Sequence, residues 1–181
     1  VKFHIDIDQS SINKNVKVDF HTNTDITMTL KEINSFIESN NIELEKKDYT
    51  NWWGQINDWR KKECLHYEQG EEIIKPQHAI SRLYDLTTQK DTFITTEVGQ
   101  HQMWAAQYYK FSKPNRWITS GGLGTMGFGM PAAVGAQMAN PDSLVIDIAG
   151  EASFLMNIQE IATAVQYKLP IKIFILNNEY M

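Results

Sequence analysis

The chain has 181 residues, of which 42% are hydrophobic and 22% are charged. This composition is typical of a globular protein that is large enough to bury a sizeable core. The formal net charge of −5 argues against nucleic acid or an anionic membrane as a partner, because both would repel it.

The sequence shows no targeting or anchoring pattern. No apolar run approaches the roughly 20 residues of a membrane helix, and no signal-peptide pattern opens the chain. The single cysteine, Cys64, excludes an internal disulfide framework and fits a reducing compartment. We therefore expect a cytoplasmic protein. Because Val1 already lies in a strand pattern and Met181 closely follows Asn178, we also expect a piece of a longer chain.

The first 75 residues carry mostly structural patterns. Residues 3–8 alternate apolar and polar side chains, as a half-buried strand does, and Asp25–Asn40 has the apolar spacing of a helix. The charged stretch 40–75 contains three tryptophans, and its spacing predicts an amphipathic helix from about Asn51 to Gln69. The tryptophans could stack on bases, but their acidic surroundings favour packing against the protein.

From Pro76 onward, helical and strand patterns alternate. Strands are predicted at 92–96, 116–119, 144–149 and 171–176, and helices at 78–87, 100–111, from Pro131, and at 155–168. This alternation predicts an α/β fold with a doubly wound, mainly parallel sheet, preceded by the tail of a second α/β domain. We expect three parts, namely a domain remnant at 1–38, a helical linker at 39–75 and the main domain at 76–181.

Two oxygen-bearing side chains follow neighbouring strands of this sheet. Glu151 comes directly after the strand 144–149 and Gly150, and Asn178 follows the strand 171–176. In a strand–helix–strand unit the two strands are parallel, so their carboxyl ends meet at the same edge. A carboxylate and an amide oxygen at such an edge are suitable ligands for Mg²⁺ carrying a diphosphate.

Glycines are concentrated beside this edge. Eight of the ten lie between Gly99 and Gly150, and five of these fall within 121–129. Clustered glycines let backbone N–H groups approach an anion closely, and the helix that follows adds the positive end of its dipole. A tight turn would need only one glycine, so the cluster favours a ligand contact. No Walker lysine follows, and the spacing does not match the dinucleotide fingerprint.

Three further residues are candidates for the same site. Met126 lies within the glycine cluster, where it could fill the core or support a ligand. Gln100 and His101 follow the strand 92–96, whose end we expect at the same edge. A lone histidine is more often structural, so the structural and functional interpretations of His101 both stay open.

At this point the residues resemble a known family, the large catalytic subunits of acetolactate synthase. The resemblance rests on Gln100–Tyr109, Thr119–Gly129, Met156–Glu160 and the pair Asn177–Asn178. It is strong over 76–181, looser over 1–35 and weak through 40–75. It implies a thiamine-diphosphate transferase that decarboxylates pyruvate and joins the two-carbon unit to pyruvate or 2-oxobutyrate. The products would be 2-acetolactate or 2-aceto-2-hydroxybutyrate, in branched-chain amino-acid biosynthesis.

The resemblance also implies roles for individual residues. Mg²⁺ would be held by Glu151, Asn178 and the backbone oxygen of Tyr180. Thiamine diphosphate would be contacted by Val98, Gly99, Gln100, His101, Gly124, Met126, Ala152, Ser153 and Asn178. FAD would belong to the complete protein, with contacts from Asp6, Ile7 and Asp25, although a strand with a solvated face explains these positions nearly as well. The complete protein would form a homodimer or tetramer, with a small regulatory subunit as a further partner.

The chain departs from the family pattern in two ways. The usual glycine–aspartate–glycine is Gly150–Glu151–Ala152 here, so the metal must shift or the longer side chain must fold back. The catalytic glutamate that activates the cofactor is absent, so we expect this chain alone to be inactive. Two alternatives remain, which are another thiamine-diphosphate 2-oxo-acid decarboxylase or ligase and a non-catalytic cofactor-binding relic.

Overall fold

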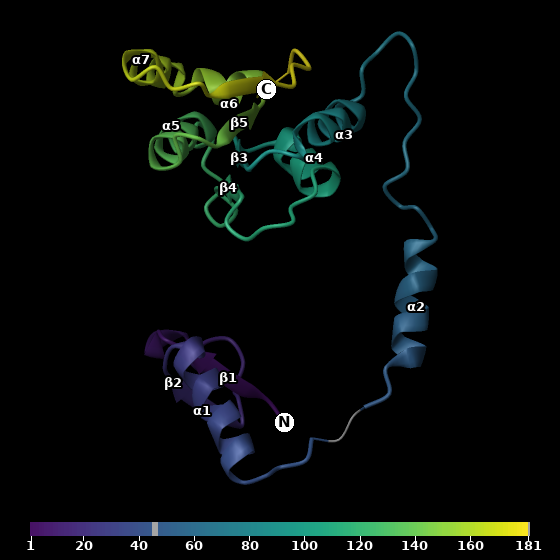
Figure 1. Ribbon diagram of the computed structural model, residues 1–181, viewed down its shortest axis with the longest axis vertical. Helices are drawn as coiled ribbons and strands as arrows, with labels where there is room; N and C mark the ends of the chain where they lie inside the picture. The colour runs from purple at the N-terminus through teal and green to yellow at the C-terminus, as the bar shows by residue number, and fades with distance from the viewer. Residues whose placement is uncertain (45–46, 181) are drawn as a thin grey trace. The chain divides into compact units, whose positions relative to one another are not determined.

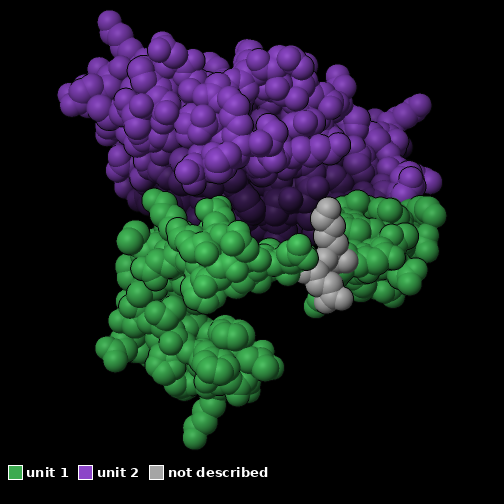
Figure 2. Space-filling model, turned by 60° about the horizontal axis from the view of Figure 1, so that its bottom comes forward, with its two compact units in different colours: residues 1–62 green, residues 63–181 purple. Residues whose placement is uncertain are grey.

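The computed structural model describes residues 1–44 and 47–180. The chain divides into two compact units, Val1–Lys62 and Glu63–Met181, which Figure 2 shows in different colours. None of the helices in the described ranges is long and apolar enough to cross a membrane. The three-part division predicted at 1–38, 39–75 and 76–181 stays a prediction, and residues 45, 46 and 181 within it lie outside the described residues.

The first unit contains a pair of parallel strands and two α-helices (Figure 1). Strand β1 (Phe3–Asp6) pairs with β2 (Phe20–Asn23), and a short 3₁₀ helix, η1 (Gln9–Ser11), follows β1. Helix α1 (Ile26–Ser39) begins where predicted, because the Asp25 carboxylate accepts hydrogen bonds from the N–H groups of Thr27 and Met28.

The second helix is shorter than its pattern predicts. Helix α2 runs over Thr50–Arg60, so the prediction of a helix to Gln69 is wrong. Glu63 has a φ of 46°, a left-handed conformation that an α-helix cannot contain. The predicted packing of the tryptophans is also not observed in this chain, because Trp52, Trp53 and Trp59 stay about half-exposed. Trp52 and Trp59 instead contact each other edge-on, with ring centroids 5.6 Å apart.

The second unit is built on a four-stranded sheet with the strand order β4-β3-β5-β6. The strands are β3 (Thr92–Thr96), β4 (Trp117–Thr119), β5 (Leu144–Ala149) and β6 (Lys172–Ile175). Each neighbouring pair is parallel. The predicted parallel sheet, and the predicted adjacency of the strands that precede Glu151 and Asn178, are therefore confirmed.

Helices cover both faces of this sheet (Figure 1). Helices α3 (Pro76–Thr87) and α4 (Gln100–Tyr108) cover one face. Helix α5 (Gly129–Ala139) covers the other, with α6 (Glu151–Leu155), η2 (Ile158–Glu160) and α7 (Ile161–Gln166). Successive residues of a strand point to opposite faces, so β3 and β5 supply both cores. The α3/α4 side buries Ile80, Ile94, Ala105, Tyr109, Ile146 and Ile148, and the α5 side Phe93, Met130, Ala133, Val134, Ala136, Val145, Ala149, Phe154 and Ala164.

The strand order places a topological switch between β3 and β5. From β3 the chain passes through α4 to β4 on one side, whereas from β5 it passes through α6 and α7 to β6 on the other. The two connections leave the carboxyl ends of β3 and β5 in opposite directions, so a crevice opens between them. Ligands of doubly wound sheets bind in such a crevice.

The helix predicted over 155–168 is interrupted, so that prediction is wrong. Three short helical segments replace it, and the break falls at Asn157, whose φ of −133° is not helical. The Asn157 side chain donates a hydrogen bond to the carbonyl of Gly127. An asparagine side chain that bonds a distant backbone group offers an alternative to the regular helix, which the apolar spacing does not reveal.

Two glycines on α5 allow a test of how tightly this helix packs against β3 and β5. A Cβ at Gly129 would lie 2.7 Å from the Glu97 nitrogen and 2.9 Å from the Thr96 carbonyl carbon, both of them backbone atoms. We predict that Gly129→Ala destabilises the chain by about 3 kcal/mol or more in urea unfolding, because the backbone must move.

Gly135, exposed on the same helix, provides the matched control. No atom lies within 4 Å of the Cβ that it would carry. Gly135→Ala should raise the free energy of unfolding by about 0.5–1 kcal/mol, because alanine favours the helix. Equal effects of the two substitutions would contradict the packing of α5 against β3 and β5.

Candidate functional site

A cavity of about 390 Å³ opens at the carboxyl edge of the sheet, at the switch between β3 and β5. Residues that follow β3, β5 and β6 converge on it, together with one residue of the glycine loop (121–129). Its lining is Val98, Gly99, Gln100, His101, Trp104, Met126, Gly150, Glu151, Ala152, Ser153, Leu176, Asn178 and Tyr180. Of the residues predicted to hold thiamine diphosphate or metal, Gly124 alone is not in this lining. A Cβ at Gly124 would lie 4.0 Å from the Val98 side chain.

The side chains of two of the three predicted metal ligands accept hydrogen bonds from one backbone group. The N–H of Tyr180 donates to Glu151 Oε1 at 3.1 Å and to Asn178 Oδ1 at 3.1 Å. Within the described residues, no group of three or more His, Cys, Asp or Glu side chains could hold a metal ion. A site here would therefore combine one carboxylate with amide and backbone oxygens. The contact that the structure gives Tyr180 is through its N–H, and ligation by its carbonyl stays a prediction.

His101 fills the space between two strand ends. Its side chain is 6% exposed, and a Cβ at Gly99 or at Gly150 would lie 2.8 Å from the ring. Both positions therefore need glycine to admit the imidazole. Burial lowers the pKa of His101, while the negative charges of Glu97 and Glu151 oppose that shift, so the ring is mainly neutral at pH 7. The Nε2 atom has no hydrogen-bond partner within the described residues.

The glycine loop needs left-handed backbone at two positions. Gly124 has a φ of 73° and Gly127 a φ of 80°, conformations that favour glycine. Ser120 closes the first turn, because its carbonyl accepts from the Gly124 N–H and its hydroxyl accepts from the Thr125 N–H. The loop leads into α5 and presents Met126 to the cavity, where the residue is 38% exposed and not part of the core.

Beneath the cavity lies a buried acid that the sequence interpretation did not single out. Glu97 follows β3 and is fully buried. Its carboxylate accepts hydrogen bonds from the Met130 N–H and from the Ser153 hydroxyl. An acid directly after a buried strand was a visible signal, but the resemblance implied cofactor contacts only for its neighbours Val98–His101.

A second buried carboxylate lies on β5. Asp147 Oδ1 accepts from the Thr95 hydroxyl at 3.0 Å, whereas Oδ2 has no partner within the described residues. Burial raises the pKa of Asp147 to about 7, and the negative charge of Glu97 adds to the rise. Asp147 is thus partly protonated at neutral pH, which lowers the electrostatic cost of burying it close to the Glu97 carboxylate.

The three candidate FAD residues lie in the first unit. Asp6 belongs to β1 and accepts from the Asp8 N–H, and Ile7 is exposed. Asp25 caps α1. The Asp25 side chain therefore has a structural task, and the FAD contacts stay predictions.

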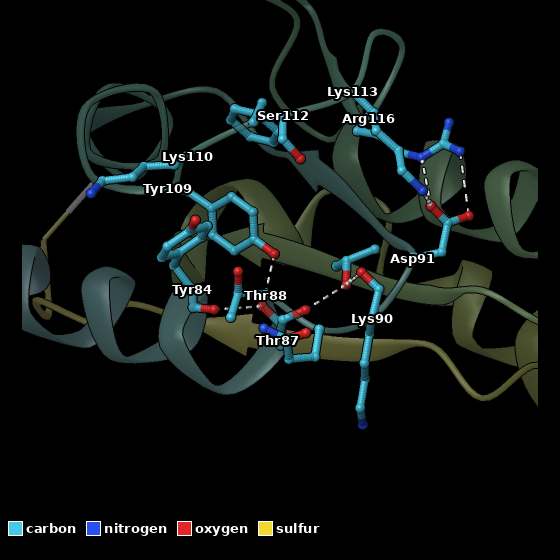
Figure 3. Close-up of a pocket in the computed structure, with 13 residues that line it drawn as sticks. Tyr84, Thr87, Thr88, Lys90, Asp91, Tyr109, Lys110, Ser112, Lys113 and Arg116 are labelled. Carbon is cyan, nitrogen blue, oxygen red and sulfur yellow. Dashed lines mark hydrogen bonds and ion pairs between the residues drawn. The ribbon is translucent and has the colours of Figure 1, made fainter.

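A second cavity, of about 220 Å³, lies at the opposite edge of the sheet (Figure 3). Asp91, just before β3, accepts hydrogen bonds from Lys113 and Arg116, which lower the pKa of its carboxyl to about 2. In Figure 3 the Lys90 and Lys110 side chains point away from Asp91 and from each other. Lys113 and Arg116 thus converge on Asp91, whereas Lys90 and Lys110 do not, and the Asp91 ion pairs link the α4–β4 loop to the start of β3.

Comparison with known proteins identifies relatives of this chain. Residues 97–181 match the family model described as the thiamine pyrophosphate enzyme, C-terminal TPP binding domain. The acetolactate synthase isozyme 3 large subunit of Escherichia coli is 47% identical over 178 residues, which cover 98% of this chain and 31% of the relative. Acetolactate synthase 1, chloroplastic, of Nicotiana tabacum is 47% identical, covering 98% of this chain and 26% of the relative. The chain thus spans less than a third of the length of these relatives.

The Asp147 carboxyl predicts how stability depends on pH. Its pKa is raised in the folded state, so the folded state binds the proton more tightly than the unfolded state, and the contribution of Asp147 to stability falls as pH rises from about 4 to about 7. Asp147→Asn should flatten this decline. The difference in the free energy of unfolding between the parent and the variant should change by a few kcal/mol from pH 4 to pH 8, because each unit of pKa shift corresponds to about 1.4 kcal/mol.

Asp91→Asn serves as the control in the same urea titrations. The pKa of Asp91 is lowered, so its contribution is already complete above pH 4, and the variant should differ from the parent by a constant amount from pH 5 to pH 8. An unchanged pH profile in Asp147→Asn would contradict the buried environment of Asp147.

Proposed function

We propose a function from the premise that this chain belongs to the acetolactate synthase large-subunit family of thiamine pyrophosphate enzymes. The chain would supply the diphosphate and metal half of the active site in a larger protein. That protein would decarboxylate pyruvate and join the two-carbon unit to a second 2-oxo acid, giving 2-acetolactate or 2-aceto-2-hydroxybutyrate. The observation that carries the proposal is the convergence of Glu151, Asn178 and the glycine-lined strand ends on one cavity.

The chemistry of the cavity fits a metal-bound diphosphate. No lysine or arginine is among the described residues that line it, although a diphosphate carries several negative charges. Glu151 adds a further negative charge. A divalent cation between the carboxylate and the phosphates would remove this repulsion, whereas a diphosphate alone would be repelled. Binding at this site should therefore require Mg²⁺.

The proposed metal ligands are Glu151, Asn178 and the carbonyl of Tyr180. These are all oxygen donors, as a hard cation prefers, and Mg²⁺ usually keeps further ligands from water and substrate phosphates. The 3.1 Å contacts to the Tyr180 N–H bring the two side-chain oxygens to the same side of the cavity. Val98, Gly99, Ala152 and Ser153 line the cavity, where their backbone would lie along the diphosphate.

The remaining lining residues would orient the organic part of the cofactor. When bound, thiamine diphosphate supplies the carbanion-stabilising chemistry, and the protein positions it. Met126 would support the aminopyrimidine from the glycine loop, with Gly124 beside it. Gln100 and His101 would face the active-site side, where the neutral imidazole can donate or accept a hydrogen bond without adding a charge.

The resemblance supports further proposals about the complete protein. It would bind FAD through contacts that include Asp6, Ile7 and Asp25, form a homodimer or tetramer, and act in the cytoplasm. Because the E. coli relative is named a large subunit, a small regulatory subunit is a further proposed partner. The cofactor-activating glutamate would come from outside this chain.

The first test is cofactor binding by this chain. We predict that it binds thiamine diphosphate in isothermal titration only when Mg²⁺ is present. Glu151→Ala and Asn178→Ala should each weaken binding by about tenfold or more, as expected for lost metal ligands. Glu160→Ala, which removes a carboxylate outside the cavity, should leave the affinity unchanged. Metal-independent binding, or equal effects of all three substitutions, would argue against the proposed ligand set.

The second test concerns the reaction of the complete protein. With pyruvate alone it should form 2-acetolactate, and with added 2-oxobutyrate it should also form 2-aceto-2-hydroxybutyrate, both identified by mass spectrometry. Acetaldehyde without either product would favour the alternative, a thiamine-diphosphate decarboxylase of another kind. Cofactor binding without turnover would instead favour a non-catalytic relic.

A further inference from the structure

Glu97 is the buried acid at the site that the proposed function does not use. It is fully buried and absent from the cavity lining, so it cannot touch a cofactor there. Its two oxygens each accept a hydrogen bond, Oε1 from the Met130 N–H at 3.0 Å and Oε2 from the Ser153 hydroxyl at 2.9 Å. Both donors belong to the helices α5 and α6 that flank the cavity.

Ser153 connects Glu97 to the glycine loop, because its hydroxyl bonds both. Its Oγ also lies 3.1 Å from the backbone nitrogen of Gly127. Because a backbone N–H can only donate, the Ser153 hydroxyl accepts from Gly127 and uses its single hydrogen to donate to Glu97. The only hydrogen of the Ser153 hydroxyl is thus used on Glu97, so a phosphate in the cavity, which can only accept, would be left with the Ser153 backbone N–H as a donor.

The hydrogen bond from Gly127 to Ser153 affects the cavity because Gly127 holds the backbone next to Met126. The residue has a φ of 80°, and a Cβ there would lie 2.7 Å from Asn157 Nδ2. Its carbonyl accepts from the same Asn157 side chain. Met126, which lines the cavity, directly precedes this fixed residue. The position of Met126 therefore depends on bonds made by Gly127 on both of its peptide groups.

We infer that Glu97 is a positioning residue for the cofactor, which acts through Ser153 on the glycine loop. This inference rests on the proposed function. The Glu97 carboxylate fixes the Ser153 hydroxyl, the hydroxyl fixes the Gly127 amide, and the amide fixes the neighbouring Met126. The same carboxylate fixes the first turn of α5 through Met130. Loss of this acceptor loosens the loop without removing any group that contacts the cofactor.

Glu97→Gln is the nearest substitution in shape. A carboxamide has one acceptor atom and one donor group, whereas Met130 and Ser153 both require an acceptor. One of the two donors is then left unpaired in a buried site, which is costly. Ser153→Ala removes the hydroxyl that connects Glu97 to Gly127. The double variant tests whether Glu97 and Ser153 act as one unit.

The experiment uses the full chain and two measurements. The first is amide hydrogen exchange without cofactor, in which Gly127 should exchange about tenfold faster or more in Glu97→Gln and in Ser153→Ala. The second is titration with thiamine diphosphate and Mg²⁺, in which each single variant should bind about tenfold more weakly. The double variant should lose about the same factor, because both residues act through one contact.

A core variant separates positioning from general stability. Ile94→Val, in the fully buried core of β3, should lower the thermal midpoint while leaving the Gly127 exchange and the affinity unchanged. Unchanged affinity in both single variants, or a hundredfold loss in the double variant, would overturn the inference. Failure of the parent chain to bind the cofactor at all would overturn the proposed function and, with it, the role of Glu97.

Discussion

The parallel pairing of β3 with β5 is the constraint on which the rest of the second unit depends. Thr96 lies opposite Ile148, and the Glu97 N–H donates to the Ile148 carbonyl one residue beyond β3. This register brings the residues after 97 and the residues after 149 to one edge. Since the chain leaves that edge in opposite directions, helices cannot close the gap, and the crevice that remains is the cavity.

The chain segments around the carboxyl ends of β3 and β5 lie close together, and this explains why glycines and buried acids occur side by side there. The backbone of Gly129 contacts the backbone of β3, and His101 occupies the space above Gly99 and Gly150. The polar groups enclosed in this layer must therefore find partners inside the protein. Both oxygens of Glu97 have donors, whereas Asp147 has a donor to one oxygen, and burial together with the negative charge of Glu97 raises the pKa of Asp147. The two buried acids are therefore accommodated differently, Glu97 by donors to both of its oxygens and Asp147 by partial protonation near neutral pH.

The sequence predicted the sheet and its edge well because both depend on local patterns. Apolar runs bounded by helices define β3, β5 and β6, and parallel geometry then places Glu151 and Asn178 together. Helix limits were predicted less well, since the breaks after Arg60 and at Asn157 depend on backbone conformation and on a contact with Gly127. Glu97 was missed because its role depends on Ser153, which lies 56 residues further along the chain. No local pattern reports such a contact.

The contact between Glu151 and Tyr180 explains what the length of the Glu151 side chain does. Its Oε1 reaches the Tyr180 N–H, across 29 residues of chain, and Asn178 Oδ1 accepts from the same N–H. The carboxylate thus holds the segment after β6 against the start of α6. A carboxylate has two oxygens, so it can bind a metal through one while the other keeps the Tyr180 contact. The extra methylene of glutamate then extends the reach of the carboxylate, so the departure from the family pattern fits the proposed metal site.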